Sequence, residues 1–328
     1  MRGMTHDMHG RHVQRGLMWS VLAAVTFGLS GTLARPLLDS GWSPAAVVLV
    51  RVLIAAAALL VPTLRSLRGR WNVVRDDAGL IAAYGLVVVA LTQFAYYSAV
   101  AHMDVAIALL VEYAAPVLVL GWLWLRHGQR PTPLTLAGAG VAIIGLLFVL
   151  DVFSGGARVS ATGMAWALVA MVGCAVYFVL SARSSALPPV ALAGTGMLLG
   201  AVVLALLGAV GVLEMHASTA SVHFRELTAP FWLPLVLVGV VATAVAYLSG
   251  INGSRLLGSR LASFVALLEV VAALIAAWVL LGQQPDPVQA FGGLGILVGV
   301  ILVKLGEPAA PTTTPHPDED IAELHLAA

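Results

Sequence analysis

The chain has 328 residues, of which 60% are apolar and 10% are charged, and its mean hydropathy is +0.97. Soluble domains carry roughly a quarter of charged residues, so this composition indicates a membrane protein with several spanning segments. The net charge of +1 gives no basic patch, and we expect no nucleic-acid partner. The single cysteine, Cys174, excludes an internal disulfide and a zinc site built from paired cysteines.

Residues 1–15 are polar and run directly into the first apolar stretch, with no convincing signal-peptide cleavage site. We interpret them as a disordered N-terminal tail, although His6, His9 and His12 are spaced so that they could contact a metal. Residues 306–328 are rich in proline, threonine and acidic residues, which predicts a second disordered tail. We expect no metal, no cofactor and no catalytic residues.

Apolar segments of about 20 residues predict an all-α polytopic membrane protein with ten transmembrane helices. The predicted spans are 16–37, 44–64, 77–99, 105–125, 132–153, 161–181, 188–213, 229–250, 261–281 and 288–305. Thirteen of the 17 Lys and Arg residues then fall on the side of the two termini, three fall on the other side, and Arg51 lies within a span. The positive-inside rule therefore predicts a multi-pass protein of the cytoplasmic membrane with both termini in the cytoplasm.

The fourth predicted span, 105–125, carries Glu112 near its middle and Pro116 one turn later. A carboxylate at the centre of a spanning helix costs at least about 2.5–3.5 kcal/mol on insertion scales. A proline there removes one helix hydrogen bond and bends the segment. We therefore interpret this span as the wall of a polar pathway, with Glu112 as a contact for a substrate amine, a group that couples transport to a proton, or a counter-ion.

Two further charges lie away from the ends of their spans, Arg51 in the second and Glu269 in the ninth. Arg51 could bind a substrate carboxylate bidentately, or it could neutralise Glu112 or Glu269 in a structural ion pair. Glu269 lies at a depth corresponding to that of Glu112, so either carboxylate could take part in proton coupling.

Uncharged polar side chains gather in the third and eighth spans. Gln93 shares a helix face with Tyr96 and Tyr97, and Tyr247 shares one with Thr243. Hydroxyl and amide groups on these faces could contact a substrate inside a cavity, whereas a tyrosine near a span end could instead anchor the helix at the membrane interface. The predicted substrate-binding or coupling residues are Arg51, Gln93, Tyr96, Glu112, Tyr247 and Glu269.

The two halves of the chain resemble each other in sequence. The segment AYYSAVA at 95–101 matches AYLSGIN at 246–252, and Gly128 and Gly138 match Gly282 and Gly292 at a constant offset of 154 residues. Each half, 16–153 and 161–305, holds five spans, and an odd number forces the halves into opposite orientations in the membrane. Inverted repeats of this kind are typical of alternating-access transporters, whose binding site lies near the midplane.

With these features the chain resembles the EamA type of the drug/metabolite transporter superfamily. The resemblance is carried by VVLVRVLIAA around Arg51, LLVEYAAPVL in the fourth span, GQRPTPLTLAGAGVAIIGLL after it, and LLEVVAALIAAWVLLGQQPDPVQAFGGLGILVGV in the second half. It implies ten spans in two five-helix repeats, cytoplasmic termini, and export of a small organic metabolite or drug. The chain departs from the family at Gln129 and Gln283, where relatives often have glutamate, and at Val270, where they often have proline.

Two GxxxG motifs, Gly196-x3-Gly200 and Gly295-x3-Gly299, offer close helix packing, either within the bundle or in a homodimer. No phosphate-binding loop is present outside the apolar spans, so we expect no ATP-driven transport by this chain alone.

The favoured function is a secondary transporter, not an enzyme, that moves a small organic metabolite or drug, with amino acids among the candidates. Its expected partners are the lipid bilayer, that small molecule and a coupling proton. The alternative is a lipid-carrier flippase or a membrane enzyme that uses the outer loop 214–228, where titratable residues gather.

Overall fold

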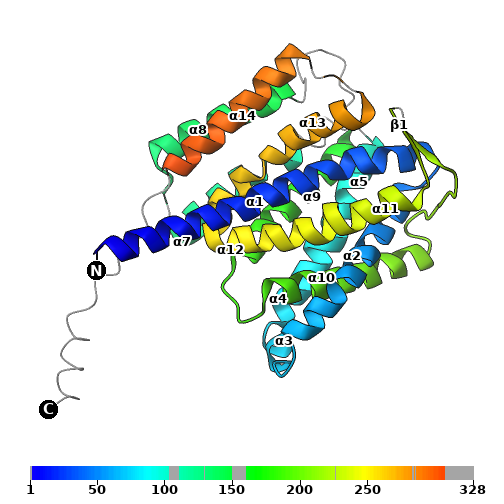
Figure 1. Cartoon of the computed structure of the whole chain (residues 1–328), viewed down its shortest axis with the longest axis horizontal. Helices are drawn as coiled ribbons and strands as arrows, with labels where there is room; N and C mark the ends of the chain where they lie inside the picture. The colour runs from blue at the N-terminus through cyan, green and yellow to red at the C-terminus, as the bar shows by residue number, and fades with distance from the viewer. Residues whose placement is uncertain are drawn as a thin grey trace.

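The computed structural model describes residues 2–102, 111–128, 130–149, 160–225, 227–282, 284 and 286–306. The elements in chain order are α1 (Arg2–Asp39), α2 (Pro44–Ser66), α3 (Asn72–Asp76), α4 (Ala78–Ala83), the π-helix η1 (Tyr84–Leu91), α5 (Thr92–His102), α7 (Ala115–His127), α8 (Pro133–Val149), α9 (Ala161–Ala182), α10 (Pro189–Ala209), β1 (Val222–Phe224), β2 (Leu227–Ala229), α11 (Trp232–Gly239), the π-helix η2 (Val240–Val245), α12 (Ala246–Val265), α13 (Leu268–Leu281) and α14 (Pro287–Gly306). Figure 1 shows them as one bundle of helices, with the two short strands at one end.

The helices confirm the predicted all-α polytopic fold. Within the described residues, six helical segments are long and apolar enough to cross a membrane, and four shorter apolar helices stand at the predicted fourth, fifth, ninth and tenth spans. The helix α1 already begins at Arg2, so residues 2–15, predicted as a disordered tail, are helical. No proline lies before Pro36 to interrupt this helix. The C-terminal tail beyond residue 306 and the side chain of Tyr97 lie outside the described residues.

The fourth span is broken rather than bent. Residues 111 and 112 are helical, Tyr113 and Ala114 form a turn, and α7 begins at Ala115. Pro116 thus sits in the first turn of α7, where a proline removes no helix hydrogen bond and its fixed φ suits the helix.

The ninth span is broken at the corresponding place although it has no proline. Its first part belongs to α12, which turns a corner at Gly258 (φ 78°, ψ 164°) and ends at Val265. Ala266 and Leu267 form a turn before α13 begins at Leu268. Broken helices of this kind are typical of transporter binding sites near the membrane midplane.

Two pairs of residues show that the halves match in backbone geometry as well as in sequence. Gly128 ends α7 and Gly282 ends α13, both in the left-handed region (φ 64° and 72°) that favours glycine. In the third and eighth spans, Thr92 and Thr243 each donate their hydroxyl to the carbonyl five residues earlier, at 2.7 Å. Both threonines therefore support a π-turn, the helix form that is frequent at functional sites.

The helices α8 and α14 lie side by side at one edge of the bundle (Figure 1). A Cβ at Gly145 would lie 2.6 Å from the backbone nitrogen of Ile296, and one at Gly299 would lie 2.5 Å from that of Ala142. The second GxxxG motif is therefore used for packing within the chain. Gly196 and Gly200 of the first motif pack in the same way against η1. The homodimer stays a prediction, and these two glycine faces are not free to form it.

The loop after α10 is tied to the corner between α1 and α2. Trp42 Nε1 donates to Ser218 O at 2.7 Å, and Ser43 Oγ donates to Glu214 O at 2.8 Å. The loop continues into the hairpin β1–β2, whose Val222 and Ala229 join a small apolar cluster with Trp42. These contacts give the loop a structural role.

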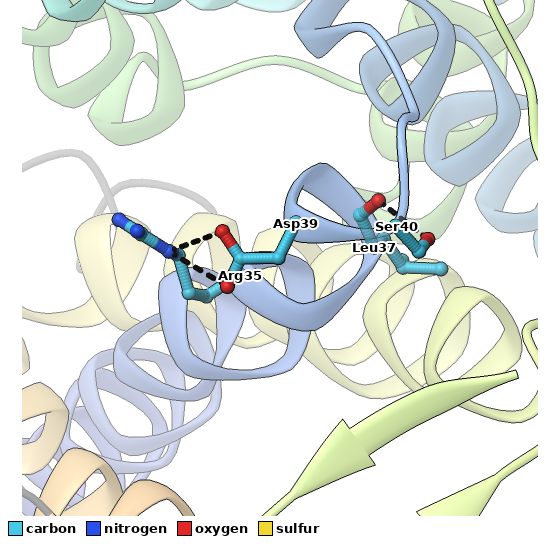
Figure 2. Close-up of polar contacts among 4 residues, drawn as sticks. All are labelled: Arg35, Leu37, Asp39 and Ser40. Carbon is cyan, nitrogen blue, oxygen red and sulfur yellow. Dashed lines mark hydrogen bonds and ion pairs between the residues drawn. The ribbon is translucent and has the colours of Figure 1, made fainter.

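The end of α1 carries an ion pair on its surface, where Arg35 Nε donates to Asp39 Oδ1 at 2.9 Å and to Oδ2 at 3.1 Å (Figure 2). The two side chains are 63% and 58% exposed, so the pair contributes only about 0.2–1 kcal/mol to stability. One residue further on, Ser40 Oγ donates to Leu37 O at 2.8 Å and helps to end the helix (Figure 2).

Candidate functional site

A cavity of about 320 Å³ lies at the centre of the bundle, between the two breaks. Its wall is formed by side chains of α1, α2, η1, α5, α7, α9, α12 and α13 together with the broken turn at Tyr113. These elements belong to the first four spans and to the sixth, eighth and ninth. All six predicted site residues line this cavity: Arg51, Gln93, Tyr96, Glu112, Tyr247 and Glu269. The sequence positions are far apart, and the fold brings them to one place.

Arg51 is 3% exposed and is held by two neutral hydroxyl groups. Its Nε donates to Thr243 Oγ1 at 3.1 Å, and its Nη1 donates to Ser30 Oγ at 2.9 Å. Thr243 in turn donates to the carbonyl of Val238, so its hydroxyl orientation is fixed by the π-turn. The guanidinium is therefore positioned by the first and eighth spans and still reaches the cavity wall.

Neither Glu112 nor Glu269 forms an ion pair with Arg51, as all three residues are described and the structure places no N–O distance of 4.0 Å or less between them. The structural ion pair between Arg51 and a carboxylate, expected as one alternative, is therefore not formed. Three charged side chains share the cavity without a direct contact between Arg51 and a carboxylate. When all are ionised, the two carboxylates and one guanidinium leave a net charge of −1.

The two carboxylates flank the two helix breaks. Glu112 comes directly before the turn of the fourth span, and Glu269 lies in the first turn of α13, where the helix dipole favours a negative charge. The Tyr113 hydroxyl faces Glu269, and the two carboxylates are close enough to repel each other when ionised. The helix α1 approaches this break closely, because a Cβ at Gly28 would lie 2.8 Å from the backbone oxygen of Glu269.

One wall of the cavity is aromatic and contains a polar bridge between two spans. Gln93 Nε2 donates to Tyr247 Oη at 3.1 Å, which links the third span to the eighth. The ring of Tyr247 packs edge to face against Phe27 (5.0 Å between centroids) and Tyr177 (5.7 Å). Tyr96 is half-buried, lines the cavity and packs near Ala99. The interface-anchor alternative does not describe Tyr96 or Tyr247.

Sequence reasoning missed Ser30 and Phe27. Both lie in the first span, where Ser30 is one of a few small polar residues in an apolar helix and Phe27 is one apolar residue among many. A small hydroxyl in a span gives a weak signal, because it can hydrogen-bond to its own helix. Their roles follow only from the tertiary packing of α1, which brings Ser30 to Arg51 of α2 and Phe27 to Tyr247 of α12.

A family model described as the EamA-like transporter family matches residues 14–151 and, a second time, residues 161–305. The chain belongs to this family. EamA-like proteins are transporters and not enzymes, so the predicted class holds and the alternative of an enzyme at the outer loop is set aside. This EamA-like transporter is a multi-pass protein of the cell membrane with a small-molecule substrate.

Three curated relatives show the range of similarity. An uncharacterized inner membrane transporter, YicL, from Salmonella typhimurium is 24% identical over 302 residues, which is 89% of this chain and 96% of YicL. An uncharacterized transporter from Archaeoglobus fulgidus is 28% identical over 286 residues, covering 86% of this chain and 93% of that one. The threonine/homoserine exporter RhtA of Salmonella typhimurium is 25% identical over 210 residues, covering 59% of this chain and 69% of RhtA.

A solved crystal structure shares the fold. It superposes with a TM-score of 0.70 over 88% of this EamA-like transporter and 97% of the solved chain, with 21% sequence identity. At this identity the likeness extends to the fold alone.

Proposed function

We propose that this EamA-like transporter moves a small zwitterionic metabolite, such as an amino acid, across the membrane by alternating access, and that the net direction is export. The observation that carries the proposal is the convergence of one guanidinium and two carboxylates, all from different spans, on a single cavity between two broken helices. A zwitterion offers the complementary pair of charges: its carboxylate would face Arg51, and its ammonium group would face Glu112 or Glu269.

Cavity size favours a metabolite over a large drug. Small-molecule pockets span about 300–1,000 Å³, and the 320 Å³ cavity is at the low end of that range. The aromatic wall of Phe27, Tyr177 and Tyr247 would cover the apolar part of the substrate. The relative RhtA is named a threonine/homoserine exporter, which supports testing these two amino acids first.

The direct test is counterflow of labelled L-threonine and L-homoserine in proteoliposomes. The proposal requires saturable exchange by the wild-type protein. Net export would appear as a lower cellular content and a higher tolerance of homoserine in cells that express the chain. Binding of neither amino acid, with transport of a cation that lacks a carboxylate, would contradict the zwitterion assignment.

Proton coupling is assigned to Glu112 and Glu269, because two carboxylates that repel each other across one cavity are well placed to share a proton. We expect uptake by the wild-type protein to depend on pH, and Glu112→Gln or Glu269→Gln to remove that dependence while the protein stays folded in detergent. Unchanged pH profiles in both variants would refute the assignment.

The orientation with cytoplasmic termini rests on the distribution of Lys and Arg in the sequence. A reporter fused after Gly306 that is active only in the cytoplasm should be active, and the same reporter inserted in the loop near Ser218 should not. The reverse pattern would show that the termini lie on the side of the membrane opposite to the cytoplasm.

A further inference from the structure

A second group of polar side chains lies behind the aromatic wall of the cavity. Its members are Tyr84 at the start of η1, Ser181 near the end of α9 and Arg255 in α12. All three are close to the ends of their spans on the face that we predict to be cytoplasmic. None of them lines the central cavity.

Arg255 uses only one side of its guanidinium. Its Nη1 donates to Leu187 O at 2.8 Å. Its Nε and Nη2, which together form the opposite edge, are buried and have no hydrogen-bond partner among the described residues. These two N–H groups are parallel, so they form the fork that receives both oxygens of a carboxylate.

Two buried hydroxyl groups lie beside this fork. Tyr84 and Ser181 are both 0% exposed, and their hydroxyls face each other near Arg255. Apart from each other, these two hydroxyls have no hydrogen-bond partner among the described residues. Each buried polar group without a partner costs about 1–3 kcal/mol, so an arrangement kept only for stability would be unfavourable. A ligand with two acceptor oxygens would satisfy these groups together.

The group lies next to residues that line the central cavity. The ring of Tyr84 lies 6.2 Å from that of Tyr177 and 6.4 Å from that of Tyr247, and both of those tyrosines line the cavity. Ser254, the neighbour of Arg255, also lines the cavity. One layer of aromatic rings therefore separates the two polar sites.

We infer that Arg255, Tyr84 and Ser181 form a second binding site, for a carboxylate group, at the cytoplasmic end of the pathway. This inference rests on the proposed function, because it takes the carboxylate to be part of the transported molecule. The substrate would meet Arg255 when the aromatic layer opens and would pass from there to Arg51, so that its carboxylate faces a guanidinium on both sides of that layer.

The chain has a carboxylate of its own in this region. Asp77 is near enough to act electrostatically on Arg255, and its Oδ2 accepts a hydrogen bond from Ser185 Oγ at 2.6 Å. The test must therefore distinguish a ligand carboxylate from Asp77, for which Asp77→Asn is the suitable variant.

Thermal unfolding of the full chain in detergent tests the site without relying on transport. The probe is sodium acetate, titrated against sodium chloride at equal ionic strength, in an Arg51→Met background that removes the guanidinium of the cavity. We expect a saturable rise in Tm with acetate, since a ligand that binds the folded state stabilises it. Arg255→Lys keeps the charge but loses the fork, and should weaken the apparent affinity about tenfold or more.

Tyr84→Phe separates binding from a purely structural role. A structural role predicts at most a small change in Tm and an intact acetate response, because the variant only removes a buried hydroxyl whose one neighbour is the Ser181 hydroxyl. The proposal predicts that the acetate response is lost while the protein remains folded. The matched control is Arg65→Lys, an exposed arginine in the last turn of α2, which should keep the full response.

Four results would overturn the inference. The first two are the absence of an acetate response in the Arg51→Met background and an acetate response that survives both Arg255→Lys and Tyr84→Phe. The other two are a response to phosphate that equals or exceeds the response to acetate, and an acetate response that appears only after Asp77→Asn. Absence of threonine or homoserine counterflow would count against the proposed function alone, because acetate binding is measured without transport.

Discussion

Replacing Arg51 by methionine tests whether this residue binds substrate or holds the bundle together. The change keeps a side chain of similar length and removes two hydrogen bonds from a charged group, to Ser30 and Thr243. Such bonds contribute about 1.5–3 kcal/mol each, but a buried guanidinium also carries a desolvation cost of several kcal/mol, which methionine does not. Thr243 keeps its bond to Val238, so its hydroxyl is not left without an acceptor.

The two contributions have opposite signs and similar sizes. We therefore expect Arg51→Met to change the free energy of unfolding by only about 1 kcal/mol, or a Tm shift of about 2–4 °C. Loss of one charged hydrogen bond to the substrate carboxylate should weaken binding by about 10- to 150-fold. Unfolding in detergent and counterflow in proteoliposomes measure the two effects separately.

The control is Arg35→Met, which removes the exposed ion pair with Asp39 and should leave both transport and Tm nearly unchanged. A large fall in Tm together with loss of transport would show that the main role of Arg51 is to stabilise the fold. Unchanged binding in a folded Arg51→Met protein would remove it from the substrate site.

Two further predictions follow from the packing. Tyr247→Phe removes the acceptor of Gln93 Nε2 and leaves the ring contacts. The Kd for the substrate should therefore rise by a few-fold, equivalent to about 0.5–1.5 kcal/mol. An unchanged Kd would place this hydrogen bond outside the substrate site. Gly145→Ala should lower stability by about 1–3 kcal/mol because its Cβ meets the backbone of α14, whereas Gly140→Ala on the same helix meets no atom within 4 Å and should be neutral or stabilising. Equal Tm values for the two alanine variants would refute the close packing of α8 on α14.

Much of the fold could be predicted because the bilayer imposes strict rules on the sequence. Span length, intramembrane charges and the glycines at helix ends can each be recognised from individual residues of the sequence. Gly128 and Gly282, which match in sequence, also have the same backbone conformation. The convergence of Arg51, Glu112 and Glu269 on one cavity also agrees with the expectation that intramembrane charges face the bundle interior.

The helix breaks and the partners of Arg51 could not be predicted in the same way. The turn at Ala266 and Leu267 has no proline or glycine in it, so tertiary packing and not local propensity sets its place. Arg51 binds Ser30 and Thr243, which are 21 and 192 residues away along the chain. Because hydroxyls are common in spans, the sequence alone does not single out these two.

The π-turns in the third and eighth spans have a consequence for movement. A π-turn holds one residue more than the α-turn it replaces, and one residue corresponds to a rotation of about 100° around the helix axis. Conversion of η1 to an α-helix would therefore rotate Gln93 away from Tyr247 while the first residues of the span keep their orientation. The same conversion in η2 would rotate Tyr247. Each half of the protein thus contains a π-helix. Its conversion to an α-helix would rotate a cavity side chain away from the cavity without moving the whole helix.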